Sequence, residues 1–389
     1  MRELLEESFR AAVAAADPLK ILAPHLPPQP SGRTFVAAAG KAAASMALAV
    51  ENNWTGPLQG IAVTRYKHGL PTKRIRVVEA GHPVPDEAGE NAAKEILATV
   101  KQLGPEDLLL ALISGGGSSL LSLPAPGVTM AQLKSLTAQL LKSGADIQEM
   151  NTVRKHLSAI AGGRLAAASR APVVALIISD VTGDDPTHIA SGPCAPDPTT
   201  IEDAKAVLAK YGIEFRGPFC ESPKSGTATN KVIATAYRSL EAAAEVFRRH
   251  GIRPEILGDT ITGEAREVGR EMARLARRTR GPAALISGGE CTVTIEGQGG
   301  RGGRCCEFLL SLGIETQGIW AIAADTDGID GSEDNAGAIL TPESMRKGHD
   351  GKVFLARHDS YGFFSALGDL VVTGPTRTNV NDYRAILVT

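Results

Sequence analysis

The fold is decided by one stretch of the chain, residues 108–121, which reads LLLALISGGGSSLL. Its first six residues are all apolar, whereas a strand with one face in water alternates apolar and polar residues. An unbroken apolar run of this length is typical of a parallel strand that is buried on both faces. The run ends in three glycines and two serines, so we predict a buried strand followed at once by a bare loop.

Working outward, similar apolar or β-branched runs alternate with segments of helical spacing. The runs begin at Thr34, Gly60, Ile75, Val173, Glu255, Ala283, Cys291, Trp320 and Leu370. Between them, apolar residues recur with helical period over 87–102, 130–143, 231–250 and 264–280. This alternation predicts an α/β protein with a parallel, doubly wound sheet.

Length and composition indicate two folded domains. The chain has 389 residues, of which 43% are hydrophobic and 22% are charged, so it can bury large cores. A Ser/Gly/Pro-rich break spans 220–230, and we place the boundary there, giving domains 1–225 and 226–389. The net charge of -2 has no basic stripe, which argues against a nucleic-acid or membrane-surface protein.

The sequence predicts a cytoplasmic protein with reduced thiols. No apolar run approaches the roughly 20 residues of a membrane span. The N-terminal segment has the spacing of an amphipathic helix and mixes acids into it, unlike a signal peptide. The five cysteines include no C-x-x-C pair and no zinc spacing.

Polar loops follow the predicted strands, and the loop at 114–119 is the most distinctive. Glycines without Cβ allow backbone N–H groups to surround an anion, and serines add further donors. This predicts a cradle for a phosphate or a carboxylate; the alternative is a turn chosen for packing. Its residues are Ser114, Gly115, Gly116, Gly117, Ser118 and Ser119.

Three cations are candidates for contacts with an anion. Lys41 follows Gly40 at a predicted helix start, where a lysine opposes the helix dipole unless a bound anion compensates it. The alternative is a surface lysine lying along its helix. Arg154 and Lys155 occupy a helical stretch, and Arg154 is suited to bidentate binding of a carboxylate. A solvated basic face is the alternative for this pair.

Carboxylates follow the strand that begins at Val173. Asp180, Asp184 and Asp185 suit Mg²⁺, which takes oxygen ligands and usually bridges phosphates. Asp180 is alternatively a base toward a hydroxyl, and all three are alternatively turn or N-cap residues. His82 also follows a strand, where it either lines the site or caps the turn.

The second half repeats the pattern of glycine loops and acids after strands. Arg301 and Arg304 stand on a glycine loop before a predicted helix, an arrangement suited to polyphosphate. The last polar loop, at 374–382, is predicted to end at a helix. The GKAAASM loop after the Thr34 run is neither a Walker A loop nor a G-x-G-x-x-G fingerprint, and the chain has no G-x-S-x-G elbow. The remaining candidates for contacts with a phosphate-bearing ligand are Gly288, Gly289, Glu290, Asp325, Asp327, Thr378 and Asn379.

Several long motifs resemble the MOFRL-type glycerate 2-kinases, the class II glycerate kinases. They are EMNTVRKHLSAIAGGRLA from Glu149, ISDVTGDDPTHIASGP from Ile178, SGGECTVTIEGQGGRGGR from Ser287 and AADTDGIDGSEDNAGA from Ala323, besides LISGGGSSLL and TGPTRTNVND. The resemblance spans nearly the whole chain. It implies a Rossmann-like N-terminal domain and a smaller C-terminal α/β domain, for which we expect a mixed sheet.

The resemblance also implies a reaction. It is the ATP-dependent phosphorylation of D-glycerate at its 2-hydroxyl, with a divalent metal such as Mg²⁺, in a cleft between the domains. Lys41 and Arg304 match the family residues that stabilise the transferring phosphoryl group. We assign Asp180 to catalysis as well, Asp184 and Asp185 to the metal, and the 114–119 loop with Arg154 and Lys155 to glycerate. Arg301 and the seven remaining candidates of the second half are assigned to the nucleotide. The expected assembly is a monomer or a homodimer.

Two departures from the family pattern stand near the predicted site. Cys305 and Cys306 replace an Asn-Gln pair, and Arg377 stands where the family has glycine. Two other functions are considered. An NAD(P)H-dependent hydroxypyruvate reductase would need a dinucleotide fingerprint that GKAAASM lacks. A non-catalytic phosphosugar-binding module would not need so many acids after strands.

Overall fold

The computed structural model describes residues 1–295, 297, 299–346 and 350–388, and the chain forms two compact units. The N-terminal unit is Pro18–Ile233. The C-terminal unit combines Met1–Asp17 with Ala234–Thr389. No helix in the described part of the chain is long and apolar enough to cross a membrane.

The N-terminal unit is built on a six-stranded sheet with the order β3-β2-β1-β4-β5-β6. The pairs that join β3, β2, β1, β4 and β5 are all parallel, as the apolar runs predict. The strands are β1 (Thr34–Ala39), β2 (Leu58–Arg65), β3 (Ile75–Ala80), β4 (Leu108–Ile113), β5 (Val173–Ile178) and β6 (Thr229–Ala234).

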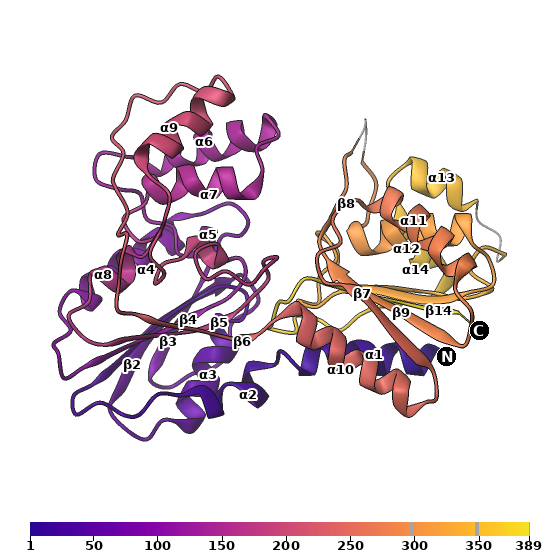
Figure 1. Cartoon of the computed structure of the whole chain (residues 1–389), viewed down its shortest axis with the longest axis horizontal. Helices are drawn as coiled ribbons and strands as arrows, with labels where there is room; N and C mark the ends of the chain where they lie inside the picture. Colours follow the sequence, from indigo (N-terminus) through magenta and orange to yellow (C-terminus); the bar gives the residue numbers. More distant parts are fainter. Residues whose placement is uncertain (296, 298, 347–349, 389) are drawn as a thin grey trace. The chain divides into compact units, whose positions relative to one another are not determined.

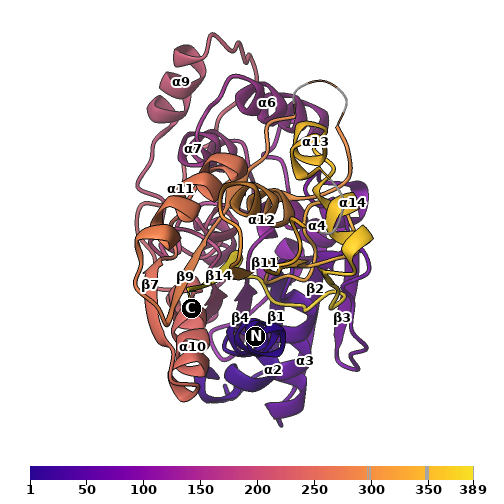
Figure 2. The same ribbon diagram turned by 90° about the vertical axis from the view of Figure 1, so that its right-hand side faces the viewer.

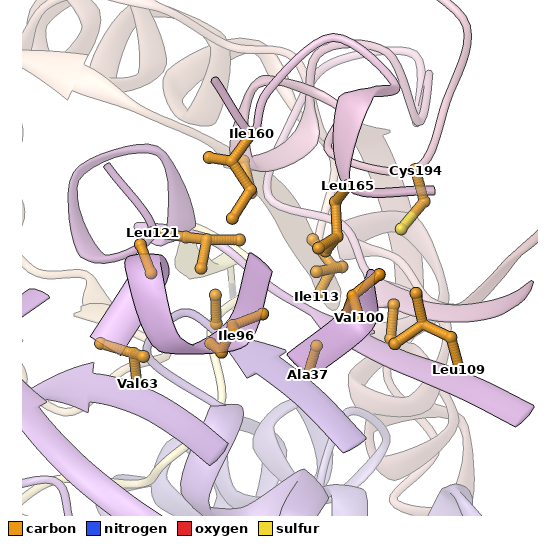
Figure 3. Close-up of a cluster of buried hydrophobic side chains, with 14 of the residues drawn as sticks. Ala37, Val63, Ile96, Val100, Leu109, Ile113, Leu121, Ile160, Leu165 and Cys194 are labelled. Atoms are coloured by element: carbon orange, nitrogen blue, oxygen red, sulfur yellow. The ribbon is translucent and has the colours of Figure 1, made fainter. Parts of the chain in front are cut away.

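Helices cover both faces of this sheet, and some form a further layer (Figure 1). One face packs against α4, α5 and α8 around a core that includes Val63, Ile96 and Ile113 (Figure 3). Helices α6, α7 and α9 share a separate apolar cluster of their own. The helices are α2 (Pro18–Ile21), η1 (Ala23–His25), α3 (Ala43–Asn53), α4 (Glu87–Val100), α5 (Gly117–Leu120), α6 (Met130–Lys142), α7 (Ile147–His156), α8 (Arg164–Ala167), η2 (Ile189–Ser191) and α9 (Ile201–Lys210).

The strand order places a topological switch point between β1 and β4. These neighbouring strands are in register, with Ala39 opposite Ile113, so their carboxyl ends lie side by side. Crevices at such a point are where open α/β sheets bind ligands. The loops that leave this point are the ones that carry Lys41 and Gly115–Gly117.

The C-terminal unit has a mixed sheet with the order β13-β12-β11-β14-β9-β7. Only β7 and β9 pair in parallel among the described ladders of this sheet; the others are antiparallel. The strands are β7 (Arg253–Gly258), β9 (Ala283–Gly289), β11 (Trp320–Asp325), β12 (Gly337–Leu340), β13 (Leu370–Val371) and β14 (Asp382–Val388), with a separate ladder of β8 (Gly263–Glu264) and β10 (Cys291–Thr292). The expected two-domain α/β fold is thereby confirmed.

Helices of the C-terminal unit enclose its sheet from both sides (Figures 1 and 2). Helices α1 and α10 cover one face, and α11 and α12 cover the other, each with its own apolar core. The helices are α1 (Arg2–Ala14), α10 (Ala236–Arg249), α11 (Ala265–Arg278), α12 (Arg304–Glu315), α13 (Gly351–Ala356) and α14 (Ser360–Leu367).

Two expectations are corrected here. Residues 1–17, predicted within domain 1–225, belong to the C-terminal unit, because the apolar face of α1 packs there. The ring of Phe9 lies 5.9 Å from that of Tyr383, whose hydroxyl donates to Ser8 at 2.8 Å. The helix expected after the 374–382 loop is instead β14, which lies between β11 and β9 in the sheet.

Candidate active site

The loops after β1 and β4 interlock at the switch point. The Lys41 N–H donates to the Gly115 carbonyl at 2.8 Å, and the Ala42 N–H donates to Ser114 Oγ at 3.1 Å. Gly40 has φ +127°, and a Cβ there would collide with Ser114. Ser114 is fully buried, and its hydroxyl joins the loop after β1 to the loop after β4. This contact fixes the backbone of the predicted anion cradle.

The side chains of Lys41 and His82 both lie close to Gly116. Gly116 has φ +80°, and a Cβ added to it would stand 2.9 Å from His82 Nε2 and 3.3 Å from Lys41 Cγ. The glycine is therefore required both by its left-handed backbone and by the two side chains beside it. His82, which the sequence left open, lies next to Lys41.

The hydroxyls of Ser118 and Ser191 connect three elements of the N-terminal unit. Ser118 Oγ on α5 lies 2.9 Å from Ser191 Oγ on η2, and Ser191 also donates to Asn151 Oδ1 on α7 at 3.2 Å. Ala190 and Ser191 have φ of 51° and 58°, which are unfavourable for residues with a Cβ. Strained backbone of this kind concentrates at functional sites.

Arg154 is the cation that faces these serines. It is half-buried on α7, and it has no hydrogen bond or ion pair to any residue that the structure describes. Burial lowers the pKa of its guanidinium. The side chain lines a cavity of about 20 Å³ with Ser118, Ser122, Ser158 and Ser191. A cation that is partly removed from water without a carboxylate is unfavourable unless an anion joins it.

Lys155, the next residue of the predicted pair, does not join this group. Its ammonium is buried and lies 3.1 Å from Asp197 Oδ1, and the side chains of both residues are almost fully excluded from solvent. Asp197 also accepts from Thr199 Oγ1 at 2.8 Å and from Ser222 Oγ at 3.0 Å. Burial opposes ionisation of Asp197, but the charge of Lys155 and the bonds from Thr199 lower its pKa. The pair joins α7 to the 197–222 segment.

Replacing Lys155 by methionine is expected to destabilise the protein. The change leaves the buried Asp197 carboxylate without its cation, and breaking such a pair costs about 3–5 kcal/mol. Chemical denaturation should report this loss, with Lys142→Met, which removes an exposed lysine from α6, as the control. A Lys155→Met protein as stable as the control would contradict the structural role of this ion pair.

The acids after β5 lie on an open loop. Asp180 is half-buried, and Asp184 has φ 54°. Asp185 Oδ1 accepts from the Thr187 N–H at 2.8 Å. Burial opposes ionisation of Asp185, but its bonds with Thr187 lower the pKa. Within the described ranges, no three His, Cys, Asp or Glu side chains are arranged to hold a metal ion. A metal at Asp184 and Asp185 would therefore draw further ligands from phosphate and water, as Mg²⁺ commonly does.

In the C-terminal unit, carboxylates converge on Arg304 at the start of α12. Its Nε donates to Asp382 Oδ1 at 2.8 Å, and its Nη2 donates to Asp325 Oδ2 at 2.7 Å. Its Nη1 lies 3.1 Å from Glu290 Oε1. Burial alone would lower the pKa of Arg304, but the three carboxylates raise it well above its ordinary value. The guanidinium is therefore charged and fixed in place.

Two other buried acids shape the backbone around Arg304. Asp330 accepts from the N–H groups of Cys305 and Cys306 at 3.0 and 2.9 Å, capping α12, and burial raises its pKa to about 6. Asp327 is 1% exposed and accepts from the Ile329 N–H at 2.8 Å. Cys305 and Cys306 are buried in the apolar core, and burial raises the pKa of both thiols.

Arg301 and Thr378, which are also predicted to contact the nucleotide, bond to residues other than Arg304. Arg301 is exposed, bonds to Glu333 and stacks 4.1 Å from the Tyr361 ring centroid. Thr378 is buried and donates to the Ala16 carbonyl at 2.7 Å, and Asn379 is buried beside it.

Two further arginines, Arg384 on β14 and Arg377 on the 374–382 loop, donate to backbone carbonyl groups. The Gly288 and Gly289 carbonyls accept from Arg384 at 3.4 Å. Arg377 has φ 60°, where the resemblance expects glycine, and its Nη1 donates to the Pro375 carbonyl at 3.4 Å. Of the residues predicted to contact the nucleotide, Glu290 and Asp325 form ion pairs with Arg304.

Comparison with known proteins agrees with this architecture. Residues 4–218 match the domain of unknown function DUF4147, and residues 283–382 match the MOFRL family. The structure superposes on the crystal structure of a glycerate kinase from Thermotoga maritima with a TM-score of 0.89 and 38% identity, covering 100% of this chain and 99% of that one. These matches define the class: two-domain α/β proteins with a MOFRL domain.

Two sequence relatives narrow the class. The glycerate 2-kinase of Pyrococcus horikoshii is 42% identical over 92% of this chain and 88% of its own length. A protein of Agrobacterium vitis with the name "Putative hydroxypyruvate reductase" is 52% identical over 100% of this chain and 94% of its own length. The chain belongs to the MOFRL-type glycerate 2-kinase family, a family of kinase enzymes, as the sequence motifs predict.

Proposed function

We propose that the chain transfers the γ-phosphoryl group of ATP to the 2-hydroxyl of D-glycerate, giving 2-phospho-D-glycerate and ADP. The observation that carries this proposal is Arg154, a half-buried cation beside four serines with no acidic partner among the described residues. Relatives named glycerate 2-kinase and glycerate kinase support the choice of substrate and reaction.

Arg154 and the neighbouring serines are suited to the carboxylate of a small acid. A guanidinium forms two parallel hydrogen bonds to a carboxylate, which fixes the orientation of the acid as well as binding it. Ser118 and Ser191 line the same cavity, and rotation of their hydroxyl groups away from each other and from Asn151 would direct these donors at the acid. An acid held there by its carboxylate would present its 2-hydroxyl on the adjacent carbon.

Lys41 and Arg304 supply positive charge for the phosphoryl group. Phosphoryl transfer depends on positioning and on electrostatic stabilisation of the phosphoryl oxygens, because little covalent chemistry is left for the protein. ATP supplies the phosphoryl group, and Mg²⁺, held by Asp184 and Asp185, would neutralise phosphate charge. Asp180, directly after β5, would accept the proton of the 2-hydroxyl. The expected location of the site between the domains stays a prediction.

The test is a coupled assay of ADP release with D-glycerate, ATP and MgCl₂. We expect turnover that requires both substrates and stops when the metal is chelated. We also propose a cytoplasmic location, which the odd and scattered set of five cysteines in the sequence predicts.

Replacing Arg154 by alanine is expected to raise the KM for D-glycerate about 10- to 100-fold, because a hydrogen bond to a charged group is worth roughly 1.5–3 kcal/mol. The KM for ATP should change little. Steady-state kinetics with each substrate varied in turn measures both values. Arg170→Ala, which removes an exposed arginine from the same unit, is the control. An effect on ATP alone would contradict the assignment of Arg154 to the substrate carboxylate.

The name of the Agrobacterium relative favours a second candidate, reduction of hydroxypyruvate. That acid carries the same carboxylate for Arg154 to bind, and the strand order is the one found in dinucleotide-binding folds. The loop after β1 nevertheless reads GKAAASM and lacks the glycines that admit a pyrophosphate. Oxidation of NADH or NADPH by hydroxypyruvate in the presence of the protein would support the reductase instead.

A further inference from the structure

The three carboxylates around Arg304 differ sharply in exposure. The side chains of Asp325 and Asp382 are 3% and 0% exposed, whereas that of Glu290 is 55% exposed. Asp382 and Asp325 accept hydrogen bonds from Nε and Nη2 of Arg304, and Glu290 forms an ion pair with Nη1. The two buried acids come from the ends of β11 and β14, and Glu290 directly follows β9.

This cluster carries an excess of negative charge. Asp382 also accepts from the buried Arg384 at 2.8 Å, so two arginines face three carboxylates. A phosphate that approached the cluster as it stands would meet net repulsion and would find a carboxylate beside each of the three guanidinium nitrogens. Departure of one carboxylate would therefore favour the binding of a phosphate to Arg304.

Glu290 is the carboxylate whose separation from Arg304 requires the least free energy. Breaking a buried ion pair leaves an uncompensated charge away from water, which is strongly unfavourable. Asp382 is shared by two arginines, and Asp325 also accepts from the Asp327 N–H at 3.0 Å, so both are fixed by further bonds. An exposed pair contributes little, since water solvates both groups once they separate.

We propose that Glu290 is an exchangeable counter-ion of Arg304. Its carboxylate occupies Nη1 of the guanidinium until a phosphate oxygen of the nucleotide takes that position. Asp325 and Asp382 hold the guanidinium in the same orientation before and after this exchange, so they are positioning residues. The inference rests on the proposed function, in which Arg304 contacts the phosphoryl group, and it changes Glu290 from a predicted nucleotide ligand into a residue that the nucleotide displaces.

The experiment measures the Kd of the non-hydrolysable analogue AMP-PNP with MgCl₂ by calorimetry, on the full chain at constant ionic strength. Glu290→Gln removes the competing charge and keeps the shape, so it should bind AMP-PNP about two- to fivefold more tightly, the range expected from losing an exposed ion pair. Glu241→Gln removes one negative charge from an exposed site on α10, on the opposite face of the sheet from α12, and should bind like the unmodified protein.

Unchanged or weaker binding by Glu290→Gln would overturn the inference, and weaker binding would restore Glu290 as a nucleotide or metal ligand. A third variant, Arg304→Lys, separates this outcome from failure of the proposed function. If Arg304→Lys binds AMP-PNP as tightly as the unmodified protein, Arg304 does not contact the phosphates at all. If Arg304→Lys weakens binding while Glu290→Gln leaves it unchanged, only the exchange of Glu290 is wrong.

Discussion

Replacing Lys41 by alanine is expected to lower kcat about 10²- to 10³-fold, the usual loss when one preorganised stabiliser of a transition-state charge is removed. The reason lies in its position at the switch point. Lys41 follows β1, its N–H is fixed to the Gly115 carbonyl at 2.8 Å, and its stem lies against Gly116. The loss should appear in kcat more than in KM, because the interaction strengthens as charge develops on the phosphoryl oxygens.

Steady-state ADP production measures this effect, with thermal unfolding as the check on the fold. Lys41→Met retains most of the apolar stem and should be as inactive as Lys41→Ala, which separates charge from packing. Lys101→Ala, an exposed lysine just after α4, should keep full turnover. Full turnover by either Lys41 variant would refute the electrostatic role.

Replacing Arg304 by alanine is expected to abolish turnover and also to destabilise the C-terminal unit. The structure links the two effects, because the same guanidinium neutralises Asp325 and Asp382, which are almost fully buried. Removing one partner of a buried ionic group costs about 3–5 kcal/mol. Arg384 remains paired with Asp382, which limits the loss of stability that the Asp382 carboxylate would otherwise cause.

Activity and stability are measured separately, by ADP production and by chemical denaturation, with Arg278→Ala as the exposed control on α11. Arg304→Lys should recover part of the stability but little of the activity, since an ammonium cannot bond to three groups in the fixed geometry of a guanidinium. An Arg304→Ala protein that is inactive yet fully stable would show that the carboxylates around it do not depend on its charge.

Much of the fold was predictable because its strands are buried on both faces. The runs from Thr34, Leu108 and Val173 form β1, β4 and β5, whose side chains are almost all buried. The place of α1 was not predictable, since its amphipathic spacing shows one apolar face but not the surface that Phe9 covers. The strand β14 was missed because it directly follows a polar loop, although its residues DYRAILV include few charges.

The types of residue in the candidate site were predictable from the sequence, but the hydrogen-bond and ion-pair partners of each residue were less so. The motif EMNTVRKHLS holds two adjacent cations, yet only the structure separates Arg154, which has no partner among the described residues, from Lys155, which is paired with Asp197. That distinction depends on a contact across 42 positions of the chain. Asp330 likewise reads as a loop acid in ADTDGIDG, whereas its carboxylate caps α12. Asn151 gave no signal of its own beyond its place in the same motif.

The most direct test of the central claim is the identity of the product formed from D-glycerate and ATP. The unmodified protein should be incubated with both substrates and MgCl₂, and the product analysed by ³¹P and ¹H NMR. We expect 2-phosphoglycerate, formed in equal amount with ADP. Formation of 3-phosphoglycerate would contradict the assignment of the 2-hydroxyl, and absence of any phosphorylated product would contradict the proposed function itself.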